Sequence, residues 1–375
     1  MQRIYFDNAA TTPLDPEVFK AMLPFFNEKF GNPSSIYSYG RETRMAIENA
    51  RKTVAKILNA HPSEIFFTSG GTESTNTAIN AAVNDLGCKH IISSPLEHHA
   101  TLHSIEYLAK TGKVKLSYVH ILANGQIDYN DLEKLLKESD EKCLVTLMHA
   151  NNEIGNITDI ERVADLCEKH DAICNIDTVQ TVGHFPIDLQ KVHVHFINAA
   201  AHKIHGPKGV GMLYINKNIK IHPFINGGSQ ERNMRAGTEN IYGIVGFAKA
   251  LEIAVENMEE ESLHIKEVKN YMKESLVKNI PGVHFNGDPE GESLYTVLSV
   301  AFPKTEKSDM LLFNLDINNI CASGGSACTS GAEAASHVIR AISKNPDQTT
   351  VRFSFSKYNT KEEVDLVVEK LKEII

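Results

Sequence analysis

The sequence predicts an α/β protein with a large domain, built on a mostly parallel sheet flanked by helices, and a smaller α+β domain. Two observations lead to this prediction. Short β-like runs alternate with amphipathic helical patterns between residues 41 and 215, and the order of elements changes after residue 276. The chain of 375 residues, 42% of them apolar, is long enough for both domains and for a sizeable core.

The strands of the large domain are predicted from short apolar runs. These runs are "EIFFT" at 64–68, "HIISS" at 90–94, "CLVTLM" at 143–148, "AICNID" at 172–177 and "HVHFIN" at 193–198. Helices are predicted between them, for example at 131–138 and 159–170. Such alternation indicates parallel strands with helices on both faces of the sheet, and ligands of such sheets bind beyond the carboxyl ends of the strands.

The smaller domain is predicted from the last third of the chain. A long helical stretch at 237–276 is followed by strands within 293–302 and 350–355 and by a terminal helix at 360–375. We expect a large domain at 15–258 and a small domain that combines 1–14 with 259–375. The small domain would carry a mobile cysteine loop at about 321–332.

Composition argues against several classes of protein. The 38 basic and 47 acidic residues give a net charge of -9 without a basic block, so we expect no direct contact with nucleic acid. The longest apolar run, at 143–148, is too short to span a bilayer, and the N-terminus lacks a secretory apolar region. We therefore expect no membrane association and a cytoplasmic location.

The six cysteines are too sparse for a disulfide framework, and none of them forms a CxxC pair. Cys143 and Cys174 lie in apolar runs and are predicted to be buried free thiols. Cys328 differs, because it stands among small residues in "SGGSACTSG" at 323–331, which are too small and polar to bury it. We expect no resident metal.

Two strand ends carry groups suited to an anion and to a cation. "FTSGGTES" at 67–74 leads through Gly71 and Thr72 into a helix, whose free N–H groups could bind a phosphate. An ordinary helix cap is the alternative. Asp177 ends a buried strand with Gln180 three residues on, so its carboxylate could hold a protonated ring nitrogen, although such an aspartate more often caps the next helix.

A third strand end carries a lysine. The run at 193–198 leads into three alanines and then into His202 and Lys203. Small residues leave room beside an amine that must form an imine with an aldehyde. A single lysine is ordinarily a solvated surface charge, but the combination matters. A phosphate cradle, a strand-end aspartate and a later lysine are the three anchors of pyridoxal phosphate.

Further polar residues follow other strands. His98, in "LEHHA", could stack on a pyridine ring and move protons, and the alternative is a surface histidine pair with His99. Asn152, in "HANNEIG", could bind a ring hydroxyl or a carboxylate, and the alternative is a polar turn. Arg352, in "TVRFSF", could grip a carboxylate from inside the protein, or it could face water from an edge strand.

These motifs together resemble the cysteine desulfurases, which are class V members of the fold type I group of pyridoxal-phosphate-dependent transferases. The resemblance covers essentially the whole chain. It is carried by "YFDNAATTP" (5–13), "FGNPSSIYSYG" (30–40), "TSGGTES" (68–74), "EHHA" (97–100), "HANNEIG" (149–155), "IDTVQ" (176–180), "AHKIHGPKGVG" (201–211), "GGSQERNMRAGTEN" (227–240) and "SGGSACTSG". The last motif is similar to that of the NifS/IscS branch.

The resemblance implies a role for each matching residue. Lys203 is the Schiff-base lysine, Cys328 the thiolate that accepts sulfur as a persulfide, and His98 the catalytic residue that stacks on the ring. The remaining implied contacts are the cofactor contacts Gly71, Thr72, Asp177, Gln180, His202 and Thr238, and the substrate contacts Asn152 and Arg352. Thr238 would reach the phosphate of a neighbouring subunit, which implies a homodimer.

The implied reaction converts L-cysteine to L-alanine and passes sulfur through Cys328 to an iron–sulfur scaffold protein, to tRNA-thiolation partners or to another acceptor. Cys328 would at most be a transient ligand of a cluster. One position departs from the family, because Ala200 replaces the usual serine near the phosphate. A selenocysteine lyase or another class V enzyme is the alternative within the fold. A non-catalytic sulfur-carrier subunit is less favoured, because both Lys203 and Cys328 are present.

Overall fold

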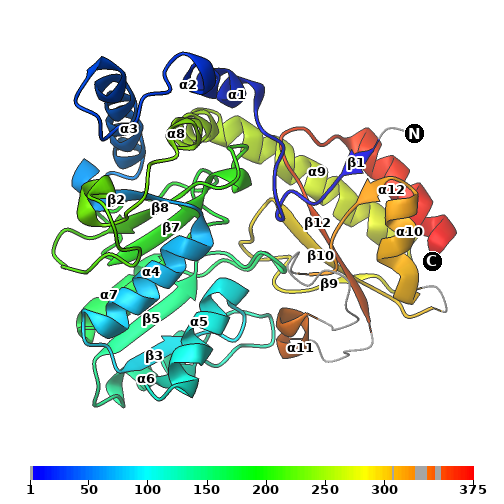
Figure 1. The fold of residues 1–375 in the computed structure, drawn as a ribbon. Helices are drawn as coiled ribbons and strands as arrows, with labels where there is room; N and C mark the ends of the chain where they lie inside the picture. The colour runs from blue at the N-terminus through cyan, green and yellow to red at the C-terminus, as the bar shows by residue number, and fades with distance from the viewer. Residues whose placement is uncertain (1–2, 306–307, 326–335, 343–347) are drawn as a thin grey trace.

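The computed structural model describes residues 3–305, 308–325, 336–342 and 348–375 (Figure 1). The large sheet has seven strands in the order β2-β8-β7-β6-β5-β3-β4. Its strands are β2 (Ile65–Thr68), β3 (His90–Ser93), β4 (Lys115–Tyr118), β5 (Cys143–Met148), β6 (Ile173–Asp177), β7 (Phe196–Ala200) and β8 (Gly211–Ile215). Strand β8 runs antiparallel to both of its neighbours, whereas the other described pairings in this sheet are parallel. The predicted mostly parallel α/β fold is therefore confirmed.

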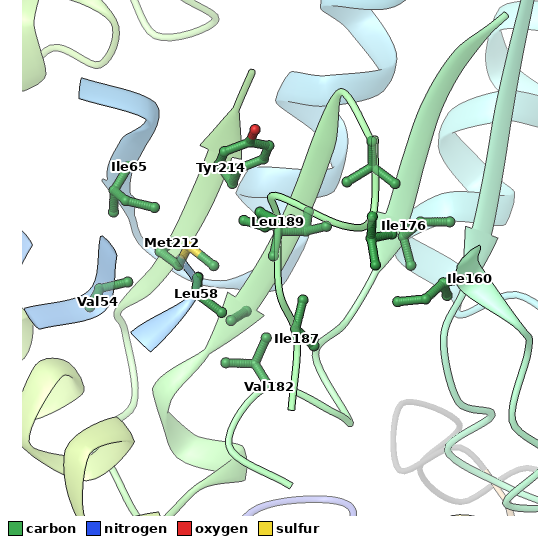
Figure 2. Packing of buried hydrophobic residues seen from close by; sticks show 14 of the residues in the cluster. Val54, Leu58, Ile65, Ile160, Ile176, Val182, Ile187, Leu189, Met212 and Tyr214 are labelled. Atoms are coloured by element: carbon green, nitrogen blue, oxygen red, sulfur yellow. The ribbon is translucent and has the colours of Figure 1, made fainter. Parts of the chain in front are cut away.

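Helices cover both faces of this sheet. They are α1 (Pro16–Met22), α2 (Pro24–Asn27), α3 (Ser38–Ile57), α4 (Gly71–Asn84), α5 (His99–Lys110), α6 (Tyr129–Lys137), α7 (Ile160–Lys169) and α8 (Ile241–Glu256). Residues of α4 and α5 share one core cluster with one face of the sheet. Residues of α1, α3, α6, α7 and α8 share a larger cluster with the other face, part of which Figure 2 shows.

The alternation of side chains along each strand decides which cluster they join. In β5, Leu144 packs toward α4 and α5, whereas Val145 and Leu147 belong to the larger cluster. This period of two is expected for a strand that is buried on both faces. Cys143 and Cys174 are buried free thiols, as predicted.

The rest of the chain forms two smaller sheets. Strands β12 (Thr349–Ser354), β10 (Val297–Phe302) and β9 (His284–Phe285) form one antiparallel sheet in that order, and β1 (Ile4–Tyr5) pairs with β11 (Ile320–Cys321) in the other. The helices here are α9 (Met258–Asn279), α10 (Leu311–Ile317), α11 (His337–Ile342) and α12 (Lys361–Ile374). Figure 1 shows these sheets beside α9 and α12, away from the seven strands.

The small sheets have a separate core cluster, which joins Phe6 near the N-terminus to residues of α9, β10, β12 and α12. The predicted helical stretch at 237–276 is two helices, because α8 ends at Glu256 and α9 begins at Met258. The proposed domain boundary at residue 258 falls at this break, and it stays a prediction. In the part of the chain that the structure describes, no helix has the length and apolar character needed to cross a membrane.

Candidate active site

One cavity of about 230 Å³ lies beyond the carboxyl ends of β5, β6 and β7. It collects predicted residues from distant parts of the chain. The predicted residues that line it are Gly71, Thr72, His98, Asn152, Asp177, Gln180, His202, Lys203 and Arg352. Parallel strands bring these segments together because their carboxyl ends meet at one edge of the sheet.

The start of α4 forms one wall of the cavity. Its cap residue, Gly70, offers no side-chain hydrogen bond to the first turn, so the helix begins without the usual capping side chain. A Cβ at Gly71 would lie 2.6 Å from Cγ2 of Val179, which explains the glycine there. Uncapped N–H groups at the start of a 14-residue helix suit an anion such as a phosphate.

A carboxylate in the first turn of α4 is neutralised. Glu73 accepts hydrogen bonds from Nε of Arg235 at 2.9 Å, from Nη2 of Arg235 at 3.1 Å and from the backbone N–H of Ser69 at 2.9 Å. Burial alone would raise the pKa of Glu73, but these hydrogen bonds lower it. Because Arg235 pairs with Glu73, this carboxylate does not present an unpaired negative charge to the anion site.

Asp177 ends β6 with only 9% of its surface exposed. Its Oδ1 accepts the backbone N–H of Val179 at 3.0 Å, so this oxygen holds a turn, and no helix that it could cap follows among the described residues before β7. Burial raises the pKa of Asp177, and the positive charge of Lys203 partly offsets this effect. A positively charged ring nitrogen would compensate the buried carboxylate further.

Lys203 ends the short 3-10 helix η2 (Ala201–Lys203) that follows β7. Its Nζ donates to the carbonyl oxygens of Ala9 and Ala10, the latter at 2.9 Å, so the N-terminal segment holds the amine beside the cavity. Ala9, Ala10 and Ala200 line the cavity as well. The structure therefore agrees with the prediction that small residues leave room beside this lysine.

His98 is the cap residue of α5, and its Nδ1 accepts the backbone N–H of Ala100 at 3.1 Å. Burial, followed by the charge of Lys203, lowers the pKa of His98 to about 4. The ring is therefore neutral near pH 7, with the proton on Nε2. The ring of His98 lies 6.2 Å from that of His99, but His98 lines the cavity and is therefore not part of a solvent-facing surface pair.

Two further predicted residues are anchored to the N-terminal segment. Nδ1 of His202 lies 3.2 Å from Oγ1 of Thr11, and burial, followed by the charge of Lys203, lowers the pKa of His202 to about 4. Nε2 of Gln180 donates to the carbonyl oxygen of Ala9 at 3.1 Å. The segment around Ala9 is therefore a structural part of the site, although sequence reasoning assigned no role to its residues.

Arg352 is 1% exposed although β12 is an edge strand of its sheet. Its Nη1 donates to the carbonyl oxygen of Asn152 at 2.8 Å, and its Nη2 donates to Oδ1 of Asp7 at 2.7 Å. Its Nε is buried without a hydrogen-bond partner among the described residues. The inward orientation is confirmed, and the guanidinium retains a donor that its protein contacts do not use.

The two asparagines of "HANNEIG" have different surroundings in the structure. Asn151 is buried, and its side chain donates to the carbonyl oxygen of Leu96 and accepts the backbone N–H groups of Glu153 and Ile154, so it holds the turn. Asn152 lines the cavity.

Sequence reasoning missed Thr75 and Val179, which also line the cavity, and Asp7, which accepts a hydrogen bond from Arg352. The motif "YFDNAATTP" contained Asp7, but only the fold shows its partner.

One predicted residue that the structure describes does not line the cavity. Thr238 is exposed and lines a separate hollow of about 190 Å³ together with Arg235. Cys328 and most of the predicted loop at 321–332 lie outside the described residues.

The residues of the cavity fit pyridoxal phosphate. They bring together an amine that could bind an aldehyde, a buried carboxylate for a ring nitrogen and an uncapped helix N-terminus for a phosphate. Arg352 adds a guanidinium to the cavity lining that could bind a substrate carboxylate. The chemistry of this donor set is thus that of an enzyme acting on amino acids.

Known proteins are similar to this chain over its whole length. The model of the family described as aminotransferase class-V matches residues 4–367. A cysteine desulfurase IscS of Dictyoglomus turgidum is 44% identical over 100% of this chain and 95% of its own length. The cysteine desulfurase NifS of Azotobacter vinelandii is 41% identical over 100% and 93%. A solved structure of a NifS-like protein superposes with a TM-score of 0.91 at 39% identity, covering 100% of this chain and 99% of that protein.

Proposed function

We propose that this chain, which belongs to the aminotransferase class-V family, is a cysteine desulfurase that uses pyridoxal phosphate. The observation that carries the proposal is the single cavity that joins Lys203, Asp177, the start of α4 and Arg352. The reaction breaks the Cβ–S bond of L-cysteine and moves the sulfur atom to the thiol of Cys328. The products are L-alanine and a persulfide on Cys328, so atoms balance without another reactant.

Different residues of the cavity hold different parts of the cofactor. Bound pyridoxal phosphate supplies an electron sink for the bond-breaking steps at the amino acid. Lys203 binds the aldehyde carbon and moves protons at Nζ, Asp177 holds the ring nitrogen, and Gln180 contacts the ring hydroxyl. The phosphate is held by Gly71, Thr72 and His202, together with Thr238 of a second subunit.

Substrate contacts come from the other side of the cavity. Arg352 and Asn152 bind the carboxylate of cysteine and so orient its Cα and Cβ. His98 covers the ring and holds its proton at Nε2, because Nδ1 already accepts a hydrogen bond from Ala100. Its pKa of about 4 keeps the imidazole neutral near pH 7.

A homodimer is part of the proposal. Large apolar side chains are exposed along the N-terminal helices and the segment that joins them, which is unusual for a surface that faces only water. They are Phe19, Leu23, Phe26, Phe30, Ile36, Tyr37, Tyr39 and Met45. We infer that a second copy covers this surface and that Thr238, which lies outside its own cavity, reaches the site of that copy.

The sulfur acceptor is proposed to be an iron–sulfur scaffold protein or another protein that takes sulfur from the persulfide. The five described cysteines are free thiols, which fits work in a reducing cytoplasm.

The test is to purify the protein, load it with pyridoxal phosphate, add L-cysteine and measure alanine and sulfide. The intact chain should form both, and Lys203→Ala should form neither. Cys328→Ala should bind pyridoxal phosphate normally but lose alanine formation. If the intact chain forms no alanine, the proposed activity is wrong. If Cys328→Ala forms alanine as fast as the intact chain, the persulfide role is wrong and the cofactor assignment stands.

A further inference from the structure

Glu97 carries a carboxyl group directly behind the floor of the cavity. It is 1% exposed and stands one residue before His98. Its Oε1 accepts the backbone N–H of Met148 at 3.0 Å, and Met148 pairs with Asp177 in the register of β5 and β6. Met148 and Asp177 both line the cavity, so Glu97 braces the strand end that presents Asp177.

No positive charge compensates this carboxyl group. Its Oε2 is buried without a hydrogen-bond partner, and the described residues offer it no ion pair within 4 Å. The charged group that acts on it is Asp177, which has the same sign. His98 beside it is neutral near pH 7, and His337 contacts only its backbone carbonyl, through Nε2 at 3.0 Å.

An ionised carboxylate in this position would be costly. A buried, unpaired charge loses its hydration without a substitute, so such a group takes up a proton instead. The cost of leaving a neutral O–H without a partner is much smaller. Burial raises the pKa of Glu97 well above its usual value, the N–H of Met148 lowers it, and the charge of Asp177 raises it further.

We propose that Glu97 is a positioning residue that keeps its proton in the folded protein and so leaves Asp177 as the only acidic charge beside the cavity floor among the described residues. A second negative charge would favour protonation of Asp177 and weaken its hold on a positive ring nitrogen. The part of this inference that concerns the ring nitrogen rests on the proposed function. The protonation of Glu97 does not.

A retained proton makes stability depend on pH in a defined direction. Unfolded chains release the proton of Glu97 above its ordinary pKa of 4.5, whereas the folded protein keeps it to a higher pH. Between these two values, stability is lost as the pH rises, by a factor of about ten in the folding equilibrium per pH unit. The variant Glu97→Gln has the shape of the neutral acid but no proton to release.

The experiment compares the unfolding of the full-length intact chain, Glu97→Gln and a control between pH 5 and 8.5, both loaded with pyridoxal phosphate and stripped of it. The control is Glu64→Gln, because Glu64 is 4% exposed and its two oxygens accept the backbone N–H groups of His61 and Lys217 at 2.8 and 3.0 Å. An amide there would leave one N–H without its acceptor, so this variant should be less stable throughout.

We expect the midpoint of unfolding of Glu97→Gln to rise relative to that of the intact chain as the pH increases, whereas Glu64→Gln shows no such gain. A difference between Glu97→Gln and the intact chain that stays constant with pH overturns the proposal. Glu97→Gln should also retain the affinity for pyridoxal phosphate at pH 7, and a loss of roughly tenfold or more overturns the proposal, because an amide replaces a neutral acid and not an anion.

The stripped protein separates this inference from the proposed function. A difference that grows with pH in the stripped protein supports the proton on Glu97 even if no alanine forms from cysteine. Conversely, a constant difference together with normal alanine formation overturns the proton on Glu97 and leaves the enzyme activity standing.

Discussion

Two regions of this molecule each bury an arginine at 1% exposure, and they use it differently. At the junction of α3 and the loop 227–240, Arg51 donates to both oxygens of Glu231 at 2.7 and 2.8 Å, to the carbonyl oxygen of Ile65 at 2.7 Å and to Glu48 at 3.1 Å. At the cavity, Arg352 donates to Asp7 and Asn152, and its Nε has no partner among the described residues. All three nitrogens of the first guanidinium donate to the protein, so we call it saturated, whereas one nitrogen of the second has no partner among the described residues.

The difference separates a structural residue from a candidate binding residue. The hydrogen bonds of Arg51 stabilise an unusual backbone segment. Glu231, Arg232 and Asn233 all have positive φ angles, of 43, 55 and 67°. Three consecutive residues in the left-handed region are strained, and the bidentate ion pair holds them in place. Arg352 holds no such strained turn, and it lines the cavity with a guanidinium that the protein leaves partly unpaired.

Removal of the saturated arginine should have the largest effect. Arg51→Met leaves the buried Glu231 carboxylate without its cation, so we expect a loss of about 3 to 5 kcal/mol in the free energy of unfolding. Urea denaturation measures this loss. The double variant Arg51→Met with Glu231→Gln should recover part of it, since no buried charge remains. A single variant as stable as the intact chain would contradict the structural role of Arg51.

A change at the unsaturated arginine should affect catalysis more than stability. Arg352→Lys keeps the positive charge but loses the forked donors, so kcat/KM for cysteine should fall by about 10- to 100-fold, equivalent to roughly 1.5 to 3 kcal/mol. Steady-state alanine formation measures this. Affinity for pyridoxal phosphate should remain near that of the intact chain. If kcat/KM is unchanged, Arg352 does not bind the substrate.

A fall in pH should lower the local stability of the cavity region more than that of the region around Arg51. Burial lowers the pKa values of His98, His184 and His202 near the cavity to about 4. The unfolded chain takes up protons at these residues below pH 6.5, so stability is lost as the pH falls from about 6.5 to 4, by about tenfold per pH unit for each histidine that an opening exposes.

Protection factors from hydrogen exchange, which correct for the intrinsic effect of pH, measure this loss. We expect β7 and η2 to lose protection before α3, because Arg51 of α3 donates hydrogen bonds to Glu231 and stays charged throughout this pH range. Equal loss of protection in both regions would contradict the comparison.

The smallest effect is expected at Ala200, the last residue of β7, which lines the cavity. Ala200→Ser adds a hydroxyl near the proposed phosphate site, worth about 0.5 to 1.5 kcal/mol if it makes a hydrogen bond. The dissociation constant for pyridoxal phosphate should therefore fall by a few-fold to about tenfold. An unchanged constant would mean that the phosphate is already satisfied by the start of α4 and its other contacts.

The elements that the sequence predicted best are those with continuous apolar runs. The run at 143–148 is β5 without change, and β6 starts one residue later than predicted. The run at 193–198 is displaced, because pairing with β6 begins only at Phe196. Strand β4 was missed because the sequence Lys115–Tyr118 is partly exposed at the edge of the sheet and has no apolar run.

The sequence by itself determined the fold class and the order of the chemical groups, because burial along a strand, helix starts and strand ends are local properties of the chain. Lys203, Asp177 and the start of α4 could therefore be identified from the order of residues alone. The tertiary structure alone decided which charges are paired. Arg51 meets Glu231 across 180 residues and Arg352 meets Asp7 across 345, while Glu97 meets no cation at all among the described residues. The interaction of two charges depends on the distance between them in space, and the local sequence around either residue does not reveal that distance.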